Sequence, residues 1–256
     1  MAGAIISGVL GANTLPAYEM GVYDLSSEKV RYYTEQGLKG YTAPDALAAD
    51  CHYLLLAIKP QNFESVLPSI KDAVRDETVI ISIAAGISPT YIKSVLGASC
   101  KVVQVMPNTP LLIGKGSVAI SRVEPVTDEE FDFACGLFEP AAGTVERIDN
   151  HLMNEVITLN GSSPAYIYLF AKVLVDRAVE LGFSHDCANR LICQALIGSA
   201  EMMLQSEKSH QELIDMVTSP GGTTFAGLEA LKQGDFNGTL RACYDATTKR
   251  AYELGK

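Results

Sequence analysis

The segment 218–224, Thr-Ser-Pro-Gly-Gly-Thr-Thr, holds two glycines and four hydroxyls within seven residues. It lies between two stretches of helical periodicity, so the N–H groups of Gly222, Thr223 and Thr224 are expected to stand free at a helix N-terminus. Ser219 adds a further hydroxyl, and Gly221 belongs to the same turn. Such donors could bind a carboxylate without a cationic side chain. A capped turn between two helices is the alternative interpretation.

A second segment that could bind a ligand, residues 56–61, follows a short apolar run that indicates a buried strand. Ligands of open α/β sheets bind beyond the carboxyl ends of the strands. Ala57, Ile58 and Lys59 occupy that end, and Pro60 stops the strand. The Lys59 ammonium is therefore placed to meet a phosphate or ribose of a cofactor, unless it is an ordinary solvated lysine.

Two further segments follow predicted strands in the same way. Residues 82–88 place the small side chains of Ala84 and Ala85 where a flat nicotinamide could lie close to the backbone. A tight strand-to-helix turn that needs Gly86 is the alternative. Residues 106–110 are expected to form a rigid loop in which Asn108 follows Pro107. The Asn108 amide and the Thr109 hydroxyl are expected to project toward a ligand.

The elements that must position these segments change in kind near residue 150. Before it, apolar runs alternate with helical stretches, which indicates a Rossmann-like doubly wound α/β sheet. The expected strands are 19–24, 51–58, 78–84 and 101–105, with edge strands at 116–121 and 143–148. The expected helices are 27–36, 62–74, 89–96 and one opened by a capping box at Thr127. After it, helices are expected at 151–159, 165–181, 185–206, 211–217 and 224–254, the last broken at Gly234.

The start of the chain lacks one expected feature. Residues 1–10 read as an amphipathic helix, which a doubly wound domain would precede with a strand and a Gly-rich phosphate-binding turn. No G-x-G-x-x-G occurs in the sequence. Either the sequence starts at an internal methionine of a longer chain, which we favour, or the natural protein dispenses with that strand.

Composition excludes several classes of function. A formal net charge of -10 disfavours nucleic acids and anionic membranes as partners. The six cysteines and four histidines are dispersed, so no metal site is expected and the thiols read as buried apolar groups. No apolar run is long enough for a membrane span, and a cytoplasmic protein is expected. In that compartment the sequons at Asn160 and Asn237 would carry no glycan.

In their order and separations, these segments resemble the pyrroline-5-carboxylate reductase family over essentially the whole chain. Residues 57–61 and 106–110 resemble its cofactor-domain signatures. Residues 161–166, Gly-Ser-Ser-Pro-Ala-Tyr, resemble its entry to the helical domain, and 215–228 resemble its most diagnostic block.

The resemblance implies an NAD(P)-binding Rossmann-like domain over 1–149, without its first strand, and a helical dimerisation and substrate-binding domain over 150–256. It implies reduction of Δ1-pyrroline-5-carboxylate to L-proline by NADPH or NADH, the last step of proline biosynthesis, in a homodimer or a ring of dimers. The implied cofactor contacts are Asp24, Ala57, Ile58, Lys59, Pro60, Ala84, Ala85, Pro107 and Asn108. The implied substrate contacts are Ser219, Gly221, Gly222, Thr223 and Thr224, and the Thr224 hydroxyl is the catalytic candidate, bonded to the ring nitrogen.

Several positions depart from the family pattern. Gln104 stands where an arginine is usual and Asn150 where a glutamate is often found, while Ser163 replaces a glycine and Pro44 an asparagine.

Cofactor preference depends on Asp24, which ends its predicted strand. A carboxylate there would bond to a ribose 2′-hydroxyl and repel a 2′-phosphate, although Ser26, Ser27 and Lys29 could accept that phosphate. We therefore expect NADH to be preferred and NADPH to be usable.

Two other functions stay open on the sequence. A β-hydroxyacid dehydrogenase would share the two-domain layout and would need a catalytic lysine on the helical domain, for which Lys172 is the nearest candidate. A non-catalytic relative that keeps the dimeric scaffold as a binding or regulatory protein is the other.

Overall fold

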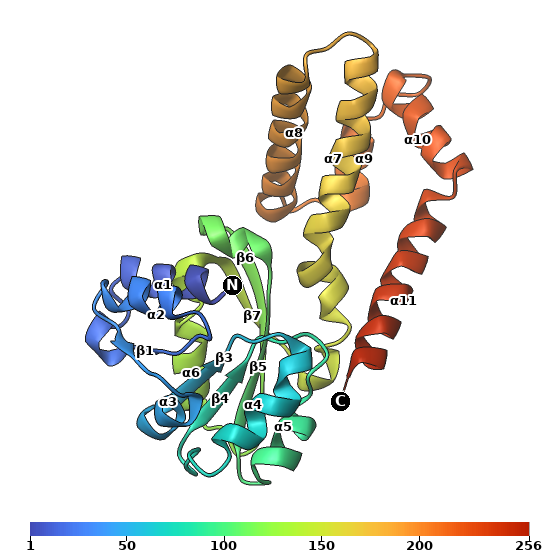
Figure 1. The fold of residues 1–256 in the computed structure, drawn as a ribbon. Helices are drawn as coiled ribbons and strands as arrows, with labels where there is room; N and C mark the ends of the chain where they lie inside the picture. Colours follow the sequence, from blue (N-terminus) through green and yellow to red (C-terminus); the bar gives the residue numbers. More distant parts are fainter. Residues whose placement is uncertain (256) are drawn as a thin grey trace. The chain divides into compact units, whose positions relative to one another are not determined.

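The computed structural model describes residues 1–255 and resolves the chain into two compact units (Figure 1). Residues 1–164 form the first unit together with the segment from Thr247 onward, and Ala165–Ala246 form the second. Within the described residues, no helix combines the length and the apolar composition that crossing a membrane requires.

The first unit is built on a five-stranded sheet. Its strands follow the order β3 (Tyr53–Leu56), β4 (Val79–Ser82), β5 (Lys101–Pro107), β6 (Gly116–Val123) and β7 (Ala142–Arg147). β3, β4 and β5 are parallel, whereas β6 runs antiparallel to β5. The expectation that 116–121 is an edge strand was wrong, since β6 lies between β5 and β7. The connection from β5 to β6 is too short for a parallel crossover, so the chain turns back beside β5.

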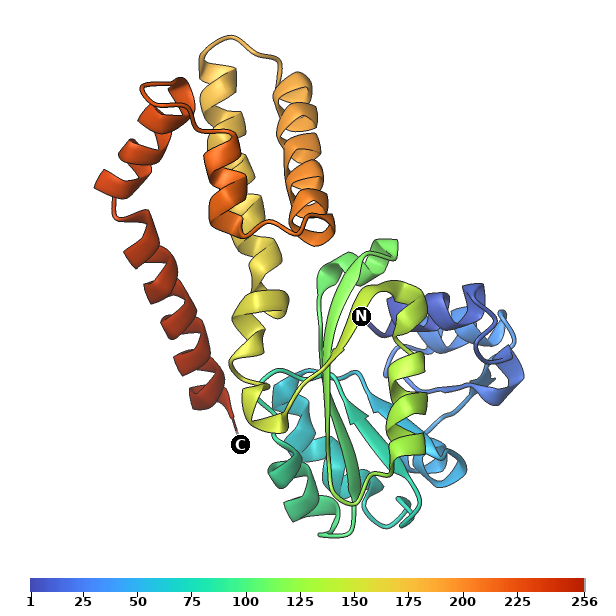
Figure 2. The same ribbon diagram turned by 180° about the vertical axis from the view of Figure 1, so that it is seen from behind.

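Both faces of this sheet are covered by helices (Figures 1 and 2). Successive strand residues point to opposite faces, and Ile81 and Val103 pack in one cluster while Ile80 and Val102 pack in another. The helices that contribute to the first cluster are α1 (Ala2–Gly11) and α6 (Asp128–Gly136), and those that contribute to the second include α4 (Phe63–Ile70) and α5 (Pro89–Leu96). The doubly wound arrangement expected from the continuous apolar runs is confirmed.

A second, two-stranded parallel sheet precedes the main one in the chain. It pairs β1 (Gly21–Val22) with β2 (Lys39–Gly40). Its flanking helices are η1 (Ala17–Glu19), α2 (Ser27–Thr34) and α3 (Pro44–Asp50), and neither β2 nor α3 was expected. The strand expected over 19–24 is shorter, since Glu19 belongs to η1 and only Gly21 and Val22 pair with β2.

The segment after β7 is not the α-helix expected over 151–159. It forms a 3₁₀ turn, η5 (Asn150–Leu152), and then a π-helix, η6 (Ile157–Ser162). The Asn160 side chain in η6 donates its Nδ2 hydrogens to the Met106 carbonyl at 2.6 Å. This tertiary hydrogen bond competes with regular helical packing, and π-helical turns frequently lie at functional sites.

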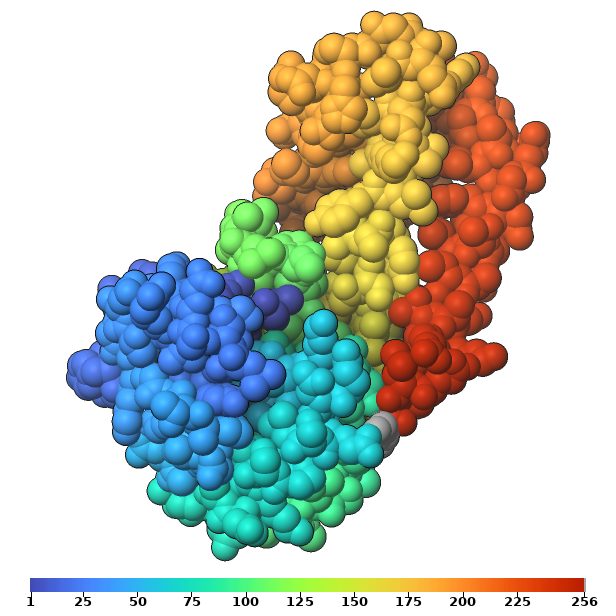
Figure 3. All heavy atoms as spheres, in the orientation of Figure 1, coloured from blue at the N-terminus to red at the C-terminus, as the bar shows by residue number. Residues whose placement is uncertain are grey.

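The second unit contains helices only, as expected. The long helices are α7 (Ser163–Glu180), α8 (His185–Gln205) and α11 (Phe236–Leu254), and the short ones are α9 (His210–Met216) and α10 (Thr223–Gln233). Ser184 and Ser209 cap α8 and α9 through their hydroxyls. The last turns of α11 return to the first unit, where Ala251 packs against Met106 and Ile157. Leu254 in the last turn of α11 also lies beside the turn at Gly86. Figure 3 shows the carboxyl-terminal turns of α11 in dark red.

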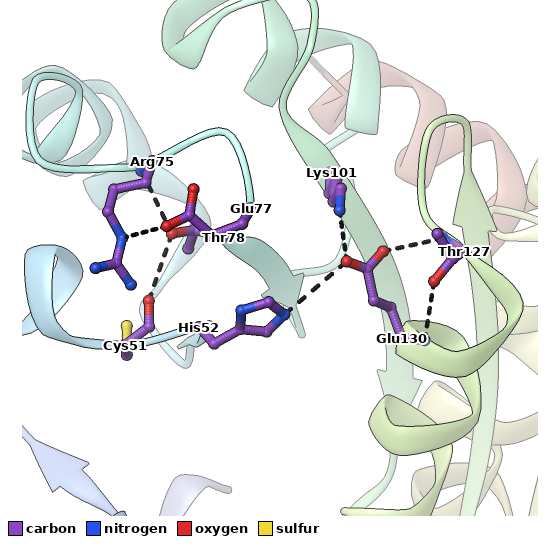
Figure 4. Close-up of polar contacts among 8 residues, drawn as sticks. All are labelled: Cys51, His52, Arg75, Glu77, Thr78, Lys101, Thr127 and Glu130. Carbon is purple, nitrogen blue, oxygen red and sulfur yellow. Dashed lines mark hydrogen bonds and ion pairs between the residues drawn. The ribbon is translucent and has the colours of Figure 1, made fainter.

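A polar cluster braces the amino end of β5 (Figure 4). Lys101 Nζ lies 2.5 Å from Glu130 Oε1, and His52 Nε2 lies 3.9 Å from the same oxygen. The other Glu130 oxygen accepts from the Thr127 N–H at 2.9 Å, and Glu130 N–H donates to the Thr127 hydroxyl. The predicted capping box is therefore confirmed and is tied to the sheet.

Candidate cofactor and substrate sites

The carboxyl ends of the parallel strands lie along one edge of the sheet. Leu56, Ser82 and Gln104 are paired across β3, β4 and β5, so the residues after each of them emerge side by side. This places the predicted segments 56–61, 82–88 and 106–110 next to one another. Ligands of open α/β sheets bind at such an edge.

The end of β4 presents small side chains beside a tight turn. Ala84 is buried, and Ala85 packs partly buried against the cluster that includes Met106. Gly86 has φ +75°, and a Cβ there would lie 3.2 Å from Leu254 Cβ. Both interpretations of this segment are compatible with the geometry. The tight turn needs Gly86, and the alanine side chains are short enough for a flat ring to lie close to the backbone.

The end of β5 differs from its prediction. Pro107 is the last residue of the strand, and Asn108 is buried at 8% exposure. The Asn108 Oδ1 accepts from the Ser117 N–H at 2.9 Å. The expectation that this amide projects toward a ligand was wrong, because its oxygen ties the loop to the neighbouring strand. Thr109, which follows, is exposed at the start of η3 (Thr109–Ile113).

A second asparagine holds the same strand end from the other side. Asn160 donates to the Met106 carbonyl and, at 3.4 Å, to the Ser117 carbonyl. The side chain is 5% exposed, and its Oδ1 has no hydrogen-bond partner among the described residues. The sequence had offered only a sequon at Asn160, and an asparagine within an irregular helix carries no other local signal.

Two departures from the family pattern are hydrogen-bonded to each other. Asn150 Nδ2 lies 3.0 Å from Gln104 Oε1 and 2.8 Å from Ser121 Oγ. Gln104 Nε2 donates to the Ile87 carbonyl at 3.3 Å. The network joins β5, β6, η5 and the turn after β4, so it fixes the strand ends from within the protein.

The end of β1 opens into a cavity of about 430 Å³. Its lining residues are Tyr23, Asp24, Leu25, Ser27, Val30, Arg31, Thr34, Tyr41 and Thr42. Asp24 accepts from the Ser26 N–H at 2.9 Å and pairs with the Lys29 ammonium at 3.1 Å. A carboxylate has about four acceptor positions, so Asp24 can still accept from a ribose hydroxyl.

In the second unit, the segment 218–224 forms the turn into α10. Gly221 has φ +71°, which favours glycine, and a Cβ on Gly222 would lie 2.5 Å from Ser219 Oγ and 3.1 Å from the Ser219 carbonyl oxygen, so the turn is tight at both glycines. The Gly222 N–H donates to the Ser219 carbonyl and is not free as expected, because the turn closes on itself. Thr223 and Thr224 occupy the first turn of the helix, where N–H groups have no carbonyl of the same helix to bind.

Other candidate groups have structural partners. Lys172 pairs with Asp176 at 2.5 Å on the exposed side of α7.

All six cysteines are free, and burial raises the pKa of Cys51 and of Cys100 to about 11. Cys193 is exposed, so the expectation of buried thiols was wrong there. No group of three metal-binding side chains occurs within residues 1–255.

A doubly wound sheet with small residues at its strand ends, followed by a helical unit, is an arrangement typical of nicotinamide-dependent oxidoreductases. Two family models match: "NADP oxidoreductase coenzyme F420-dependent" over residues 1–86, and "Pyrroline-5-carboxylate reductase dimerisation" over 150–254. Pyrroline-5-carboxylate reductase of Aquifex aeolicus is 34% identical over 91% of this chain and 86% of its own. That of Methanosarcina acetivorans is 30% identical over 100% of this chain and 95% of its own.

Solved structures agree with the sequence comparisons. Pyrroline carboxylate reductase of Plasmodium falciparum with NADP bound superposes with a TM-score of 0.90 at 29% identity, covering 99% of this chain and 94% of that one. The enzyme of Streptococcus pyogenes gives 0.89 at 31% identity, with coverage of 99% and 95%. The chain belongs to the pyrroline-5-carboxylate reductase family.

Proposed function

We infer that the chain reduces Δ1-pyrroline-5-carboxylate to L-proline with NAD(P)H, the last step of proline biosynthesis. Relatives that carry this enzyme's name match nearly the whole chain. Within the structure, the observation that best supports the substrate is the turn into α10, where two glycines and several hydroxyl-bearing residues adjoin the N–H groups of the first helical turn. A carboxylate is the ligand that such donors favour.

The substrate would be held by Ser219, Gly221, Gly222, Thr223 and Thr224. The hydroxyl of Ser219 and the N–H groups of Thr223 and Thr224 would bind its carboxylate, and the Thr224 hydroxyl would bond to the ring nitrogen. Gly222 would contribute its small size rather than its N–H group. Reduction of a C=N bond is easiest when the nitrogen is protonated, so the chain's task is mainly to orient two bound reactants.

The cofactor would be held along the strand ends by Ala57, Ile58, Lys59, Pro60, Ala84, Ala85, Pro107 and Asn108, with Asp24 at the ribose. When bound, it supplies the hydride. Asn108 would act by fixing the loop after β5, since its amide oxygen is bonded to Ser117. The exposed Lys59 side chain would meet a phosphate.

For the coenzyme we propose a preference for NADH with NADPH usable. The Asp24 carboxylate can accept a hydrogen bond from a free ribose 2′-hydroxyl. A 2′-phosphate would have to displace this carboxylate from the Lys29 ammonium before it could bind that ammonium itself. The positive charge of Lys29 reduces the repulsion between the Asp24 carboxylate and a 2′-phosphate, which supports the use of NADPH as well.

The test is oxidation of NADH and NADPH with racemic pyrroline-5-carboxylate. Thr224→Val should lower kcat/KM by about 10- to 100-fold, because it removes a hydrogen bond made to the reacting nitrogen. Thr224→Ser keeps the hydroxyl and should recover most of the activity. Full kcat and KM in Thr224→Val would exclude the proposed role, and turnover of 3-hydroxyisobutyrate instead would exclude the reaction.

The division into a cofactor domain over 1–149 and a substrate and dimerisation domain over 150–256 is also proposed. We propose a homodimer that can assemble further into a ring of dimers. The match of 150–254 to a dimerisation model supports the dimer. Apolar side chains exposed on α7, among them Leu169 and Val173, support it as well, since stable dimers bury such surface.

A further inference from the structure

The cavity at the end of β1 contains one cation that the proposed cofactor contacts do not use. Its volume of about 430 Å³ is within the range of pockets that hold small molecules. Among its lining residues in the described part of the chain, Arg31 carries the only positive charge and Asp24 the only negative charge. Lys29, which pairs with Asp24, does not line the cavity. Arg31 is therefore the group in this cavity that can attract an anion.

The position of Arg31 is set by α2, one face of which lines the cavity. The four residues that α2 contributes are spaced as neighbours on one helical face: Ser27, Val30, Arg31 and Thr34. Long side chains of a helix lean toward its amino end. The amino end of α2 follows shortly after Asp24, which comes at the end of β1. The Arg31 side chain is thus long enough and suitably placed to approach a ribose bound at Asp24.

The Arg31 guanidinium is available to a ligand. Its Nε lies 3.8 Å from Glu35 Oε1, and the two side chains are 73% and 69% exposed. An ion pair at this distance between exposed side chains contributes little, so it is easily exchanged for another anion. The guanidinium makes no hydrogen bond within residues 1–255. All of its N–H donors are free to bind two oxygens of one phosphate, the geometry that arginine favours.

Two hydroxyl groups of the cavity are also free. Thr34 donates its hydroxyl to the Arg31 carbonyl at 2.8 Å, so this group is already used. The hydroxyls of Ser27 and Thr42 make no hydrogen bond within the described residues. Ser27 belongs to α2 and Thr42 to the segment after β2, so these two donors come from different elements. A cation with neutral donors beside it suits a phosphate monoester.

We propose that Arg31 binds the 2′-phosphate of NADPH, with the hydroxyls of Ser27 and Thr42 as further donors. The inference rests on the proposed function, because it takes the adenosine ribose to lie at Asp24. In NADH the 2′-oxygen is a hydroxyl and bonds to Asp24. In NADPH the phosphate lies toward Arg31, while Lys29 stays paired with Asp24 and reduces the repulsion. The same cavity thereby accepts both coenzymes.

The two coenzymes themselves test the proposal, since NADPH and NADH differ only in the 2′-phosphate. Their dissociation constants are measured by calorimetry without substrate, on the wild-type chain and on Arg31→Gln, Arg31→Lys and Arg75→Gln. Arg75 is the matched control: it is exposed, pairs with Glu77 at 3.0 Å and does not line the cavity. Because each ratio compares two ligands on one variant, a partly folded preparation affects both measurements alike.

Arg31→Gln should weaken NADPH binding about 10- to 100-fold, the usual effect of losing a hydrogen-bonded charge, and leave NADH binding within about twofold. Arg31→Lys keeps the charge without the two-point contact and should lie between Arg31→Gln and the wild type. Arg75→Gln should change neither coenzyme by more than about twofold.

The proposal is overturned if Arg31→Gln keeps its affinity for NADPH, if it loses affinity for both coenzymes equally, or if Arg75→Gln loses as much. A wild-type chain that binds neither coenzyme overturns it as well. Failure of the proposed function appears separately, as a wild-type chain that binds both coenzymes and does not reduce pyrroline-5-carboxylate.

Discussion

At the scale of residues, Gln104 and Asn150 show that departures from a family pattern can be coupled. They lie 46 positions apart and share a hydrogen bond of 3.0 Å. Where the family resemblance leads one to expect an arginine and a glutamate, this chain has two neutral amides. The partly buried amide pair avoids the desolvation cost of two charges and keeps the link between β5 and η5. The substitutions are thus compatible with a working enzyme.

Restoring one charge alone should therefore be harmful. Gln104→Arg places an unpaired guanidinium at a position that is 5% exposed and should lower the free energy of unfolding by about 2–4 kcal/mol. Adding Asn150→Glu should recover more than half of that loss. Urea unfolding of the wild type, both single variants and the double variant measures the coupling. Strictly additive effects would contradict it.

The ion pair between Asp24 and Lys29 makes a reciprocal prediction about coenzyme choice. Asp24→Ser removes the carboxylate and frees the ammonium, so NADPH affinity should rise about tenfold while NADH affinity falls. Lys29→Ala should weaken NADPH binding more than NADH binding. Fluorescence titration of both coenzymes checks these directions, with Lys71→Ala as an exposed control outside the cavity. Equal responses of the two coenzymes to Asp24→Ser would remove Asp24 from the ribose site.

The candidate sites could be anticipated from sequence where strand ends and a glycine pair mark the backbone. Ala84 and Lys59 could be predicted because they follow apolar strand segments, and the turn at Gly221 because two glycines are adjacent. The burial of Asn108 and of Asn160 could not be anticipated, because each side chain makes a hydrogen bond with Ser117, a residue of another strand. No periodicity or local motif encodes that pairing.

At the scale of elements, the start of α6 is coupled to the sheet through Glu130. Burial by itself raises the pKa of this carboxyl, but hydrogen bonds from Lys101 and Thr127 outweigh it and hold the pKa below its ordinary value of 4.5. A carboxyl with a lowered pKa in the folded state stabilises the protein above its unfolded pKa. That contribution is lost as the pH falls through the folded value.

Glu130→Gln should therefore cost about 1–2 kcal/mol at pH 7 and progressively less below about pH 4.5. Glu129→Gln, one residue earlier and exposed, should have little effect at either pH. Chemical denaturation of the three proteins from pH 3 to 7 gives the measurement, each in a His52→Ala background that removes the ion pair between His52 and Glu130. A Glu130→Gln penalty that grew toward low pH would show that the sign is wrong.

Element boundaries were predictable where a side chain caps the helix. Ser88 and Thr127 each bind an N–H of the first turn, and the helices they begin start where expected. The strand β2 was missed because its two residues leave no alternating pattern, and α3 was missed because it has only seven residues and no side-chain cap. The segment that became η6 has helical periodicity, and the bond from Asn160 to Met106 overrides it.

At the scale of the whole molecule, the second unit leaves many apolar side chains exposed in the single chain. Leu169 is 60% exposed and Val173 is 59% exposed, four residues apart on α7. Residues at that spacing share one face of a helix. Such a face supports the proposed association of two copies.

Light scattering should accordingly give twice the 27.5 kDa chain mass, or an even multiple of it for a ring of dimers. Leu169→Glu with Val173→Glu should shift the mass to that of one chain, because two charges on an apolar interface are costly to desolvate. Lys71→Glu in the first unit, also an exposed change of charge, should leave the mass unaltered. An unchanged mass in the double variant would place the contact elsewhere.

The segment from Thr247 onward belongs to the first unit, and Ala251 sits in a cluster with Met106 and Ile157. The ribosome must therefore synthesise all of Ala165–Ala246 before the first unit can gain its final packing layer. At about 5–20 residues per second, the nascent first unit waits on the order of 5–20 s for this layer. During translation, Met106 lacks its contact with Ala251 until α11 has left the ribosome.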